Sequence, residues 1–369
     1  MTTVGVLGAG QLGRMLALAG VPMGLRFAFY DTTPDAPAAG LGAFHCAPWS
    51  DRARLDAFAA GCDVVTYEFE NVPADVARRI AETKPVHPVP RALEVAQDRV
   101  HEKALFRELG IETAPFAEVD GPEDLERAVA AVGLPAVLKT RREGYDGKGQ
   151  RVIRRVSEAA AALVALGGSG LILEGFVPFD RELSILAARG ADGAVVHWPL
   201  VENVHREGIL RVATAPAPRC DARTAGGAAD LARRVLDHLG YVGVLAIELF
   251  EHEGRLIANE MAPRVHNSGH WTIEGAKTSQ FANHLRAVSG WPLGSTDPVG
   301  VAAMVNLVGT VPATEDVLGI PGARLHLYGK APRPGRKLGH VTFVENDREA
   351  LARSLRLLAE VIPEPALPR

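Results

Sequence analysis

Short apolar runs and amphipathic segments alternate in the N-terminal part of the sequence, and this order constrains the fold more than any other feature. The predicted strands are residues 4–8, 26–30 and 63–67, and the predicted helices are residues 11–19 and 52–60. Parallel strands need a long crossover, usually a helix, to connect them. The alternation therefore predicts a parallel sheet with helices on its faces, which is an α/β arrangement.

A G-x-G-x-x-G motif lies at residues 8–13, between the first predicted strand and the first predicted helix. Asp31 stands at the end of the next strand, where the acidic residue of a dinucleotide-binding protein bonds a ribose. One hypothesis is therefore an NAD(P)-dependent Rossmann oxidoreductase. The other is that the glycines allow a tight turn and close packing of helix on sheet, with a different anion at the helix N-terminus. The motif alone leaves both open.

A proline-rich segment at residues 84–91 and a segment rich in proline and glycine at residues 291–300 predict two boundaries along the chain. No helix is expected in the first segment, because Pro85, Pro88 and Pro90 interrupt it. The other predictions, in chain order, are a helix at 99–109, a loop at 113–122, a helix at 123–131, strands at 136–140, 151–155 and 171–173, a helix at 225–239, a hairpin of 243–250 and 255–259, and a final helix with Leu351, Leu355, Leu358 and Ile362 on one face.

The composition excludes several classes of protein. The chain has 369 residues, 47% of them hydrophobic and 23% charged, as is typical of globular proteins with sizeable cores. A formal net charge of −4 offers no overall positive field, so neither nucleic acid nor a membrane is an expected partner. Cys46, Cys62 and Cys220 lie far apart, which predicts neither disulfides nor a thiolate zinc site. No apolar run is long enough to span a bilayer, and the expected location is the cytoplasm.

A second glycine-rich segment, residues 144–150, follows the predicted strand 136–140. Its three glycines let backbone amides approach phosphate oxygens without interference from a Cβ atom, and Lys148 adds a positive charge. An ordinary tight hairpin turn is the alternative. Lys139, at the end of the strand, favours a phosphate site, because a solvated lysine needs no such fixed place.

Glu248 and Glu260 each follow an apolar stretch in the predicted hairpin. Two carboxylates that converge with phosphates are a common magnesium arrangement, because this small, hard cation prefers oxygen ligands. Strict pairing across a four-residue loop would put the two side chains on opposite faces of the sheet, whereas a bulge or a five-residue loop would bring them together. The sequence leaves open whether they form a metal site or are two unrelated surface glutamates.

Two further carboxylates are weaker candidates for nucleotide binding. Glu174 stands at the end of a predicted strand and precedes free backbone groups, so it could read the edge of an adenine, and Glu182 could bond ribose hydroxyls. Solvated glutamates are the commoner explanation for such a pair.

Two polar segments near the end of the hairpin and in the C-terminal part suit an anionic ligand. Residues 264–271 are rich in hydrogen-bond donors, and the glutamate of a zinc-peptidase HExxH motif is absent between His266 and His270. Residues 333–337, with Lys330 before them, form a basic loop that could bind a phosphate, although a solvated basic turn is equally compatible.

Five segments together resemble the ATP-grasp superfamily and, within it, the 5-(carboxyamino)imidazole ribonucleotide synthase family of microbial purine biosynthesis. They are residues 8–15, 67–72, 144–150, 262–271 and 333–340. The resemblance implies an ATP-grasp fold of mixed α/β and α+β class. Its implied parts are an N-terminal Rossmann-like domain (1–97), an ATP-grasp domain (98–290) with a lid subdomain (about 114–175), and a C-terminal domain that completes the substrate site (291–369).

The resemblance also implies a reaction and a set of site residues. The reaction is the carboxylation of the exocyclic amine of 5-aminoimidazole ribonucleotide by ATP and bicarbonate through carboxyphosphate, with magnesium and without biotin, in a cytoplasmic homodimer. The implied magnesium ligands are Glu248 and Glu260, and the implied catalytic residues are Lys139, Arg264 and His270. The implied ATP-binding residues are Arg99, Lys139, Gly144, Tyr145, Asp146, Gly147, Lys148, Gly149, Gln150, Glu174, Gly175, Phe176, Val177, Glu182, His205, Asn259 and Glu260. The implied substrate-binding residues are Gln11, Glu70, Tyr145, Asp146, Arg264, Asn267, Ser268, His270, Lys330, Arg336 and Lys337.

One departure from the superfamily pattern concerns the second metal carboxylate. Many ATP-grasp enzymes have E-x-N-x-R there, whereas this chain has no asparagine between Glu260 and Arg264, which fits the synthase family and leaves a third protein ligand open. An oxidoreductase would leave residues 144–150, the glutamate pair and residues 262–271 unexplained. A non-catalytic nucleotide sensor would be expected to lack the carboxylates or Lys139, and both are present.

Overall fold

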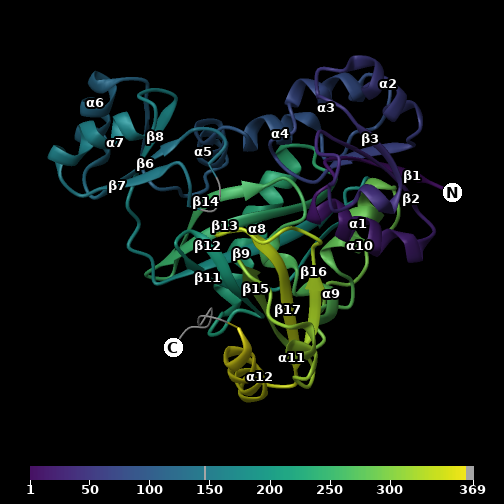
Figure 1. Ribbon diagram of the computed structural model, residues 1–369. Coiled ribbons are helices and arrows are strands. Elements are labelled where there is room, and N and C mark those ends of the chain that lie inside the picture. The colour runs from purple at the N-terminus through teal and green to yellow at the C-terminus, as the bar shows by residue number, and fades with distance from the viewer. Residues whose placement is uncertain (145–146, 363–369) are drawn as a thin grey trace.

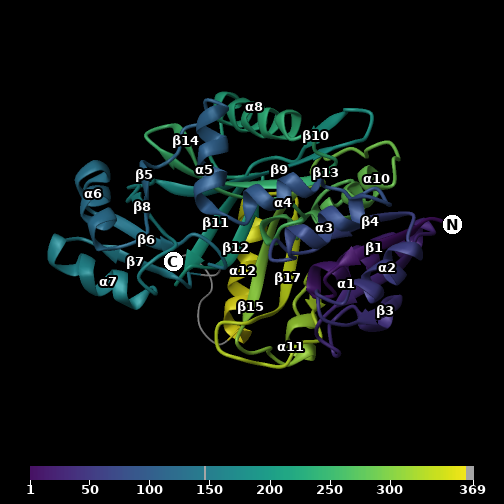
Figure 2. The same ribbon diagram turned by 90° about the horizontal axis from the view of Figure 1, so that it is seen from above.

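The computed structural model describes residues 1–144 and 147–362 (Figure 1). The predictions for Tyr145 and Asp146 lie outside these residues. The described residues form three sheets, and Figures 1 and 2 show them as lobes that meet at a common centre. Within the described part of the chain, no helix is both long enough and apolar enough to cross a membrane. Cys46, Cys62 and Cys220 are free thiols.

The N-terminal lobe contains the predicted parallel sheet, with strand order β3-β2-β1-β4. Its strands are β1 (Thr3–Leu7), β2 (Arg26–Asp31), β3 (Ala43–Cys46) and β4 (Val64–Tyr67), and its helices are α1 (Gln11–Gly20), α2 (Arg52–Ala60) and α3 (Ala74–Ala81). The sequence did not predict β3, because an edge strand with no fully buried residue carries no apolar pattern.

Two helices connect this lobe to the rest of the chain. The expectation that residues 84–91 contain no helix is wrong, since α4 (Pro90–Ala96) begins at Pro90. Proline is tolerated at the first helical position, where its missing N–H would have no partner within the helix. Helix α5 (Arg99–Glu108) follows, and the side chain of Asp98 caps it by accepting from Val100 N at 3.0 Å.

The lid lobe, residues 116–175, is an antiparallel sheet with strand order β5-β8-β6-β7 (Figure 1). Its elements are β5 (Phe116–Val119), α6 (Pro122–Val132), β6 (Ala136–Thr140), β7 (Gln150–Ile153), α7 (Ala159–Ala165) and β8 (Leu171–Gly175). Strand β5 overturns the prediction of a loop at residues 113–122. It lies at the edge of the sheet and buries only Val119, so its sequence lacks the alternation that indicates a strand.

The central sheet has nine strands among the described residues, eight of them in the order β14-β13-β9-β11-β12-β15-β17-β16, with β10 paired to β9. The strands are β9 (Arg181–Arg189), β10 (Val195–His197), β11 (Val201–Arg206), β12 (Ile209–Ala215), β13 (Gly243–His252), β14 (Arg255–Ala262), β15 (Val301–Val308), β16 (Arg324–Leu327) and β17 (Lys337–Glu345). The helices are α8 (Ala222–His238), α9 (Thr272–Gly275), α10 (Gln280–Val288), α11 (Thr314–Leu318) and α12 (Arg348–Val361).

Helices cover both faces of this sheet. On β9, Leu183 and Ile185 pack in a core with residues of α5 and α8, whereas Leu186 and Ala188 pack with residues of α1 and α10. The core that contains Leu186 and Ala188 also contains residues of α1 and β1 from the N-terminal lobe. It therefore packs this lobe against the central sheet and fixes their relative orientation.

The C-terminal strands continue the central sheet through the pairing of β12 with β15. The predicted boundary at residues 291–300 falls in a connection without helix or strand, yet the described residues after it form no sheet of their own. Leu351 and Leu358 of α12 are buried in the core beneath β15 and β17, on the predicted apolar face.

Candidate active site

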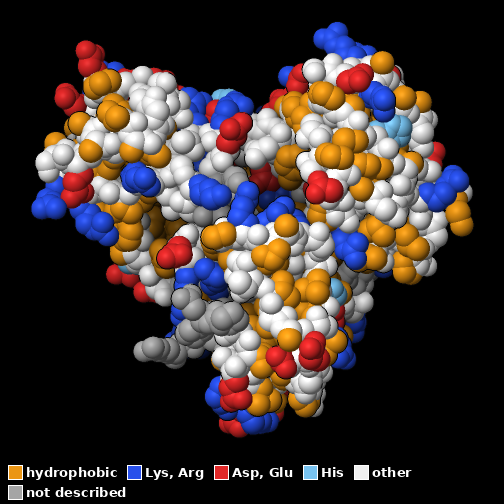
Figure 3. Space-filling view, viewed as in Figure 1, with side chains coloured by type: hydrophobic (Ala, Val, Ile, Leu, Met, Phe, Trp, Pro, Cys, Tyr) orange, Lys and Arg blue, Asp and Glu red, His pale blue; other side chains and the backbone are white. Residues whose placement is uncertain are grey.

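A cavity of about 650 Å³ lies where the N-terminal lobe, the lid lobe and the central sheet meet. Gln11 and Glu70 line it from the N-terminal lobe, Lys139 from the lid lobe and Lys330 from the C-terminal part. Figure 3 shows a hollow between the lobes with Lys and Arg side chains gathered in it. The volume suits a ligand of nucleotide size, and the lining combines Lys and Arg side chains, which suit an anionic ligand, with glutamates, which suit a cation.

A β-bulge in the β13–β14 hairpin brings the two predicted metal carboxylates together. The strands pair regularly from the turn up to Leu249 opposite Ala258. The next pair is Glu248 with Glu260, because Asn259 is an extra residue in β14. Directly opposed residues share one face of a sheet. A register without the bulge would have paired Glu248 with Asn259 and turned Glu260 to the other face.

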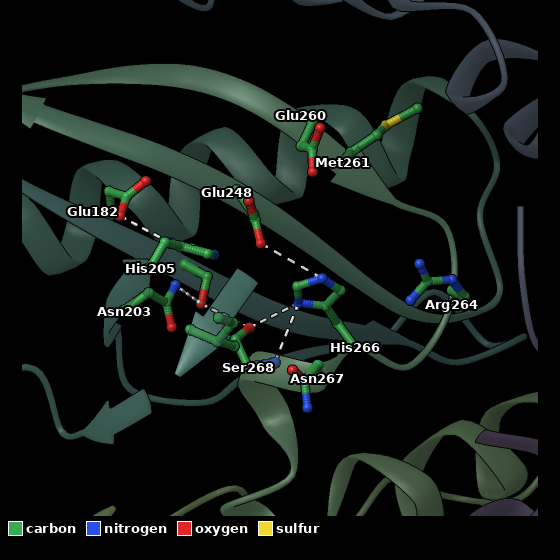
Figure 4. A network of polar contacts seen from close by, with 12 residues as sticks. Glu182, Asn203, His205, Glu248, Glu260, Met261, Arg264, His266, Asn267 and Ser268 are labelled. Atoms are coloured by element: carbon green, nitrogen blue, oxygen red, sulfur yellow. Dashed lines mark hydrogen bonds and ion pairs between the residues drawn. The ribbon is translucent and has the colours of Figure 1, made fainter. Parts of the chain in front are cut away.

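The two carboxylates have different electrostatic surroundings. Burial in the cleft would raise the pKa of Glu260, but the charge of Arg99 and its hydrogen bond, 2.8 Å from Nη1 to Oε2, lower it to about 2. Burial and then the charge of Glu260 raise the pKa of Glu248 to about 7. His266 Nε2 lies 3.5 Å from Glu248 Oε1, and burial lowers the pKa of His266 to about 3 (Figure 4). A cation bound between Glu248 and Glu260, in addition to Arg99, would relieve the repulsion between the two carboxylates.

Glu174, at the end of β8, pairs with two lysines beside the cavity. Its Oε2 lies 3.0 Å from Nζ of Lys139 and 3.1 Å from Nζ of Lys103. Burial alone would raise the pKa of Glu174, but the two ammonium groups lower it to about 2. Burial lowers the pKa of Lys139. The pair therefore holds the Lys139 ammonium at a fixed place in the cavity wall.

The second glycine segment connects β6 to β7 and reaches the central sheet. Gly147 (φ 74°) and Gly149 (φ 70°) adopt the left-handed conformation that other residues rarely adopt. A Cβ on Gly147 would lie 2.6 Å from the carbonyl oxygen of Glu207, in the turn between β11 and β12. Arg99 donates to the carbonyl of Gly144 at 3.1 Å. Through Arg99, Gly144 at one end of the segment is thus linked to Glu260.

The first glycine segment uses its amides within the protein. Ala9 N donates to Asp31 Oδ2 at 2.7 Å. Gly10 N and Gly13 N donate to the two carboxylate oxygens of Glu68 at 2.5 and 2.6 Å. A bound dinucleotide would need these donors for its pyrophosphate and Asp31 for its ribose. Since both are engaged, the structure does not support the oxidoreductase alternative.

Arg264 connects the end of the hairpin to the N-terminal lobe. Its guanidinium donates to a carboxylate oxygen of Glu70, and both side chains line the cavity. Burial alone would raise the pKa of Glu70, but the charge of Arg264 lowers it. Lys330 Nζ donates to Gln11 Oε1, also at the cavity. Two contacts between lobes therefore lie in the site itself.

Most of the described residues implied by the resemblance line the cavity. They are Gln11, Glu70, Arg99, Lys139, Gly144, Gly147, Lys148, Gln150, Glu174, Gly175, Phe176, Val177, Glu182, His205, Glu248, Asn259, Glu260, Arg264, Asn267, Lys330 and Lys337. Of the implied residues that the structure describes, those that do not line it are Gly149, Ser268, His270 and Arg336.

His270 lies behind the cavity wall. It is fully buried, its Nδ1 accepts from Gln280 Nε2 at 3.1 Å, and its ring packs against Phe281. A short 3₁₀ turn (Asn267–Gly269) directs it inward. The expectation that His270 touches the substrate therefore disagrees with its position.

Ser268 and Arg336 are also displaced from the expected contacts. Ser268 is buried; its Oγ lies 2.8 Å from Ser184 Oγ and 2.9 Å from His266 Nδ1, so it supports the His266 ring (Figure 4). Arg336 donates to the carbonyl of Ala331 within its own loop at 3.2 Å.

Three buried charged residues near the site were not named as candidates in the sequence analysis. Glu68 binds the first glycine segment, while Glu102 and Lys103 of α5 contact β14. A signal for the last two was present in the sequence, because they stand three and four residues after Arg99 and so share its face of the helix. Nothing in the sequence indicated where that face is directed.

The fold and the cavity define an enzyme of the ATP-grasp class, in which a lid lobe and a central sheet enclose a glycine-rich segment, a paired lysine and two facing carboxylates. Family models match along the chain: the ribonucleotide synthetase preATP-grasp domain at residues 1–97, the ATP-grasp domain at 104–281 and the phosphoribosylaminoimidazole carboxylase C-terminal domain at 302–354.

Individual relatives narrow the class to one family. The N5-carboxyaminoimidazole ribonucleotide synthase of Pseudomonas aeruginosa is 52% identical over 348 residues, which are 94% of this chain and 96% of that protein. The crystal structure of the Thermus thermophilus synthetase has 55% identity and a TM-score of 0.95, and the match covers 99% of both chains. The Aspergillus clavatus synthase, in complex with ADP and 5-aminoimidazole ribonucleotide, has 30% identity and a TM-score of 0.91 over 97% of this chain and 98% of that one. The chain belongs to the N5-carboxyaminoimidazole ribonucleotide synthase family, which confirms the family predicted from its motifs.

Proposed function

We propose that the chain catalyses the ATP-dependent carboxylation of 5-aminoimidazole ribonucleotide, giving 5-carboxyaminoimidazole ribonucleotide, ADP and phosphate in purine biosynthesis. Membership of the synthase family supports this, as does the relative that binds ADP and 5-aminoimidazole ribonucleotide together. One observation carries the proposal for this chain. The bulge at Asn259 faces Glu248 toward Glu260 in the same cavity that Lys139 and Arg264 line.

The chemistry proceeds in two transfers. Bicarbonate is a poor electrophile, so one of its oxygens first attacks the γ-phosphorus of ATP, the bond to ADP breaks, and carboxyphosphate forms. The exocyclic amine of the ribonucleotide then attacks the carboxyl carbon, either of carboxyphosphate or of CO2 released from it. Phosphate leaves and the amine gives up a proton. Because carboxyphosphate hydrolyses readily, closure of the lid lobe would exclude water during both transfers.

Lys139 and the second glycine segment are proposed to hold the phosphates of ATP. The Glu174 carboxylate already fixes the Lys139 ammonium, so little reorganisation is needed when negative charge spreads over the transferring phosphoryl group. The nucleoside end is assigned to the stretch from Glu174 to Val177, with Glu182, His205 and Asn259. Glu182 Oε2 lies 2.8 Å from His205 Nδ1, and the carboxylate keeps its other oxygen for a ribose hydroxyl (Figure 4).

Magnesium is the proposed cofactor, and Glu248 and Glu260 are its proposed ligands. The chemistry of the site fits, because two opposed carboxylates repel each other strongly enough to raise the pKa of Glu248 to about 7, after burial as the first cause. Among the described residues, no three His, Cys, Asp or Glu side chains form a metal-holding group. Two protein carboxylates together with phosphate oxygens would complete the coordination that this ion usually has. When bound, it offsets the charge of the phosphates.

Arg264 is the proposed anchor of the bicarbonate-derived intermediate and the ribonucleotide. It is buried apart from its face to the cavity, and Glu70 holds it in place before substrate arrives. The further substrate contacts are assigned to residues that line the same cavity from three parts of the chain: Gln11, Glu70, Asn267, Lys330 and Lys337. We assign no substrate contact to Ser268 and His270, which are buried behind the cavity wall, or to Arg336, which donates within its own loop.

The division into domains at 1–97, 98–290 and 291–369 is part of the proposal, as are a homodimeric state and a cytoplasmic location. The N-terminal boundary is supported by the family model that ends at residue 97. The family resemblance supports the other two expectations, which analytical ultracentrifugation and cell fractionation would test.

Product identification tests the proposed function. Purified enzyme is incubated with ATP, magnesium, labelled bicarbonate and 5-aminoimidazole ribonucleotide. We expect label in a product that loses it on mild acid treatment, as a carbamate does. Label that is never incorporated, or fluorescence enhancement of NADH on addition of enzyme, would instead support a different class of enzyme.

A further inference from the structure

Two consecutive side chains of α5 hold the backbone on both sides of Glu260. Glu102 Oε1 accepts from Met261 N at 2.5 Å, and Lys103 Nζ donates to the carbonyl of Asn259 at 3.0 Å. The two peptide groups that flank the metal carboxylate are therefore both bonded to one helix.

Arg99 adds a contact from the same helix face, because it precedes Glu102 and Lys103 by three and four residues. Its guanidinium donates to the Glu260 carboxylate at 2.8 Å. One face of α5 thus fixes the side chain of Glu260 and the backbone before and after it.

These contacts satisfy backbone groups that have no strand partner. Strand β14 lies at the edge of the central sheet, so the outward N–H and C=O groups around its bulge need other partners. The Ala258 amide donates to the carbonyl of Glu112 at 2.8 Å, while Glu102 and Lys103 serve the next positions along the strand.

Both side chains are withdrawn from water to an extent that is unusual for charged residues. Glu102 exposes 2% of its surface and Lys103 none. Lys103 also lies 3.1 Å from Glu174 Oε2, which pairs with Lys139. The same ammonium therefore connects the bulge to the phosphate-binding lysine, and burying it without a structural task would be costly.

We propose that Glu102 and Lys103 are positioning residues that keep the bulge at Asn259, and thereby keep Glu260 opposite Glu248. The inference rests on the proposed function, because it takes these two glutamates as the magnesium ligands. Loss of the contacts would allow β14 to shift toward a regular register, in which Glu260 turns away from Glu248.

Binding of Mn2+ to the complex of full-length enzyme with ADP, followed by the electron paramagnetic resonance signal of free Mn2+, tests this without turnover. We expect Lys103→Met and Glu102→Asp to weaken Mn2+ binding roughly 10- to 100-fold, as is typical when groups that orient metal ligands are changed. Glu102→Gln keeps an oxygen acceptor at the same reach and should bind Mn2+ nearly as the wild type does.

Leu105→Ala is the matched control on the same helix. Leu105 is buried in the core away from the cavity lining, so this variant should lower the melting temperature and leave Mn2+ affinity unchanged. If it weakened Mn2+ binding as much as Lys103→Met does, general destabilisation would explain the effect and the proposal would be wrong.

Folded Lys103→Met and Glu102→Asp with wild-type Mn2+ affinity would overturn the inference. Should Lys103→Met not fold, the comparison of Glu102→Asp with Glu102→Gln decides alone, and equal affinities in that pair count against it. Failure of the proposed function gives a separate result. In that case Glu260→Gln would bind Mn2+ as the wild type does.

Discussion

The two glycine-rich segments of this chain look alike in sequence and differ in what their backbone can bind. Each follows an apolar strand and contains glycines with positive φ, as at Gly8 (98°) and Gly147 (74°). In the first segment, amides that could hold a phosphate donate to the carboxylates of Asp31 and Glu68. The second segment lies against the cavity, near Lys139. The comparison shows that glycine spacing specifies a turn, whereas the carboxylates packed against that turn decide whether it is available to an anion.

The largest effect on activity is expected from substitution of Lys139, the lysine next to the second segment. Lys139→Met removes a fixed positive charge from the proposed phosphate site and should lower kcat roughly 10²- to 10³-fold, as loss of a preorganised electrostatic contact does. Steady-state phosphate release measures it. Lys277→Met, on an exposed lysine that pairs with Asp297, is the control and should leave kcat unchanged. Normal turnover by Lys139→Met would mean that phosphates bind elsewhere.

The carboxylates beside the two segments should respond to pH in opposite directions. The two lysines lower the folded-state pKa of Glu174 from 4.5 to about 2, so its charge stabilises the fold above pH 4.5 and this stability is lost as pH falls toward 2. At about 1.4 kcal/mol per pKa unit, up to about 3 kcal/mol is at stake. Urea unfolding of wild type and Glu174→Gln, from about pH 6 to pH 3, should show their difference shrinking with acid. A constant difference would contradict the ion pair.

For Glu68 the sign is reversed, because burial raises its folded-state pKa above 4.5. Its contribution to stability is therefore complete below pH 4.5 and declines as pH rises through the folded-state value. The same urea series on Glu68→Gln should show the variant gaining on the wild type as pH increases. If the stability differences of Glu68→Gln and Glu174→Gln changed with pH in the same direction, the two carboxylates would not differ in the way proposed.

Adding a methyl group to each segment should separate stability from nucleotide binding. In Gly8→Ala the new Cβ would lie 2.5 Å from Glu68 Cγ, so we expect a loss of about 1–3 kcal/mol in the free energy of unfolding and an unchanged KM for ATP. In Gly147→Ala the new Cβ would lie 2.6 Å from the carbonyl oxygen of Glu207, so stability should fall as well, and KM for ATP should rise about tenfold because the strain falls on the proposed phosphate segment. If instead KM for ATP rose in Gly8→Ala and stayed unchanged in Gly147→Ala, the nucleotide would bind at the first segment.

The smallest effect is expected from Glu68→Gln at neutral pH. The amide side chain keeps one oxygen acceptor for the two amides of Gly10 and Gly13, so about 1 kcal/mol of stability should be lost. Differential scanning calorimetry and the KM for ATP measure this together. A change in KM without a change in stability would be the contrary result.

The sequence predicted the parts of the fold in which apolar periodicity, a local property, is clear. The parallel sheet, the hairpin and the apolar face of α12 all follow from it. Strands β3 and β5 were missed, since edge strands bury too few side chains to show a period. No strand was predicted for β9–β12 or β15–β17 either, so most of the central sheet was not found from the sequence. The helix that begins at Pro90 was missed because one proline is compatible with a helix start as well as with a break.

Site residues could be predicted where residue type and spacing alone indicate a chemical role. They could not be predicted where the role depends on contact with a residue far away in the sequence. Glu248 and Glu260 could be named, but the bulge that unites them depends on where Asn259 is accommodated. Glu102 and Lys103 stand in a helix that looks amphipathic only in part, and their contacts with β14 lie more than a hundred residues away. His270 resembled a site residue because of its neighbours, and a 3₁₀ turn directs it into the core.

Phosphate release from ATP, measured with bicarbonate and 5-aminoimidazole ribonucleotide each supplied or withheld, tests most directly whether one cavity joins both transfers. The expected result is rapid release only when both are present, with one phosphate formed per labelled carbamate, and loss of this release in Glu260→Gln. Release that ignores the ribonucleotide, or that survives in Glu260→Gln, would contradict the account.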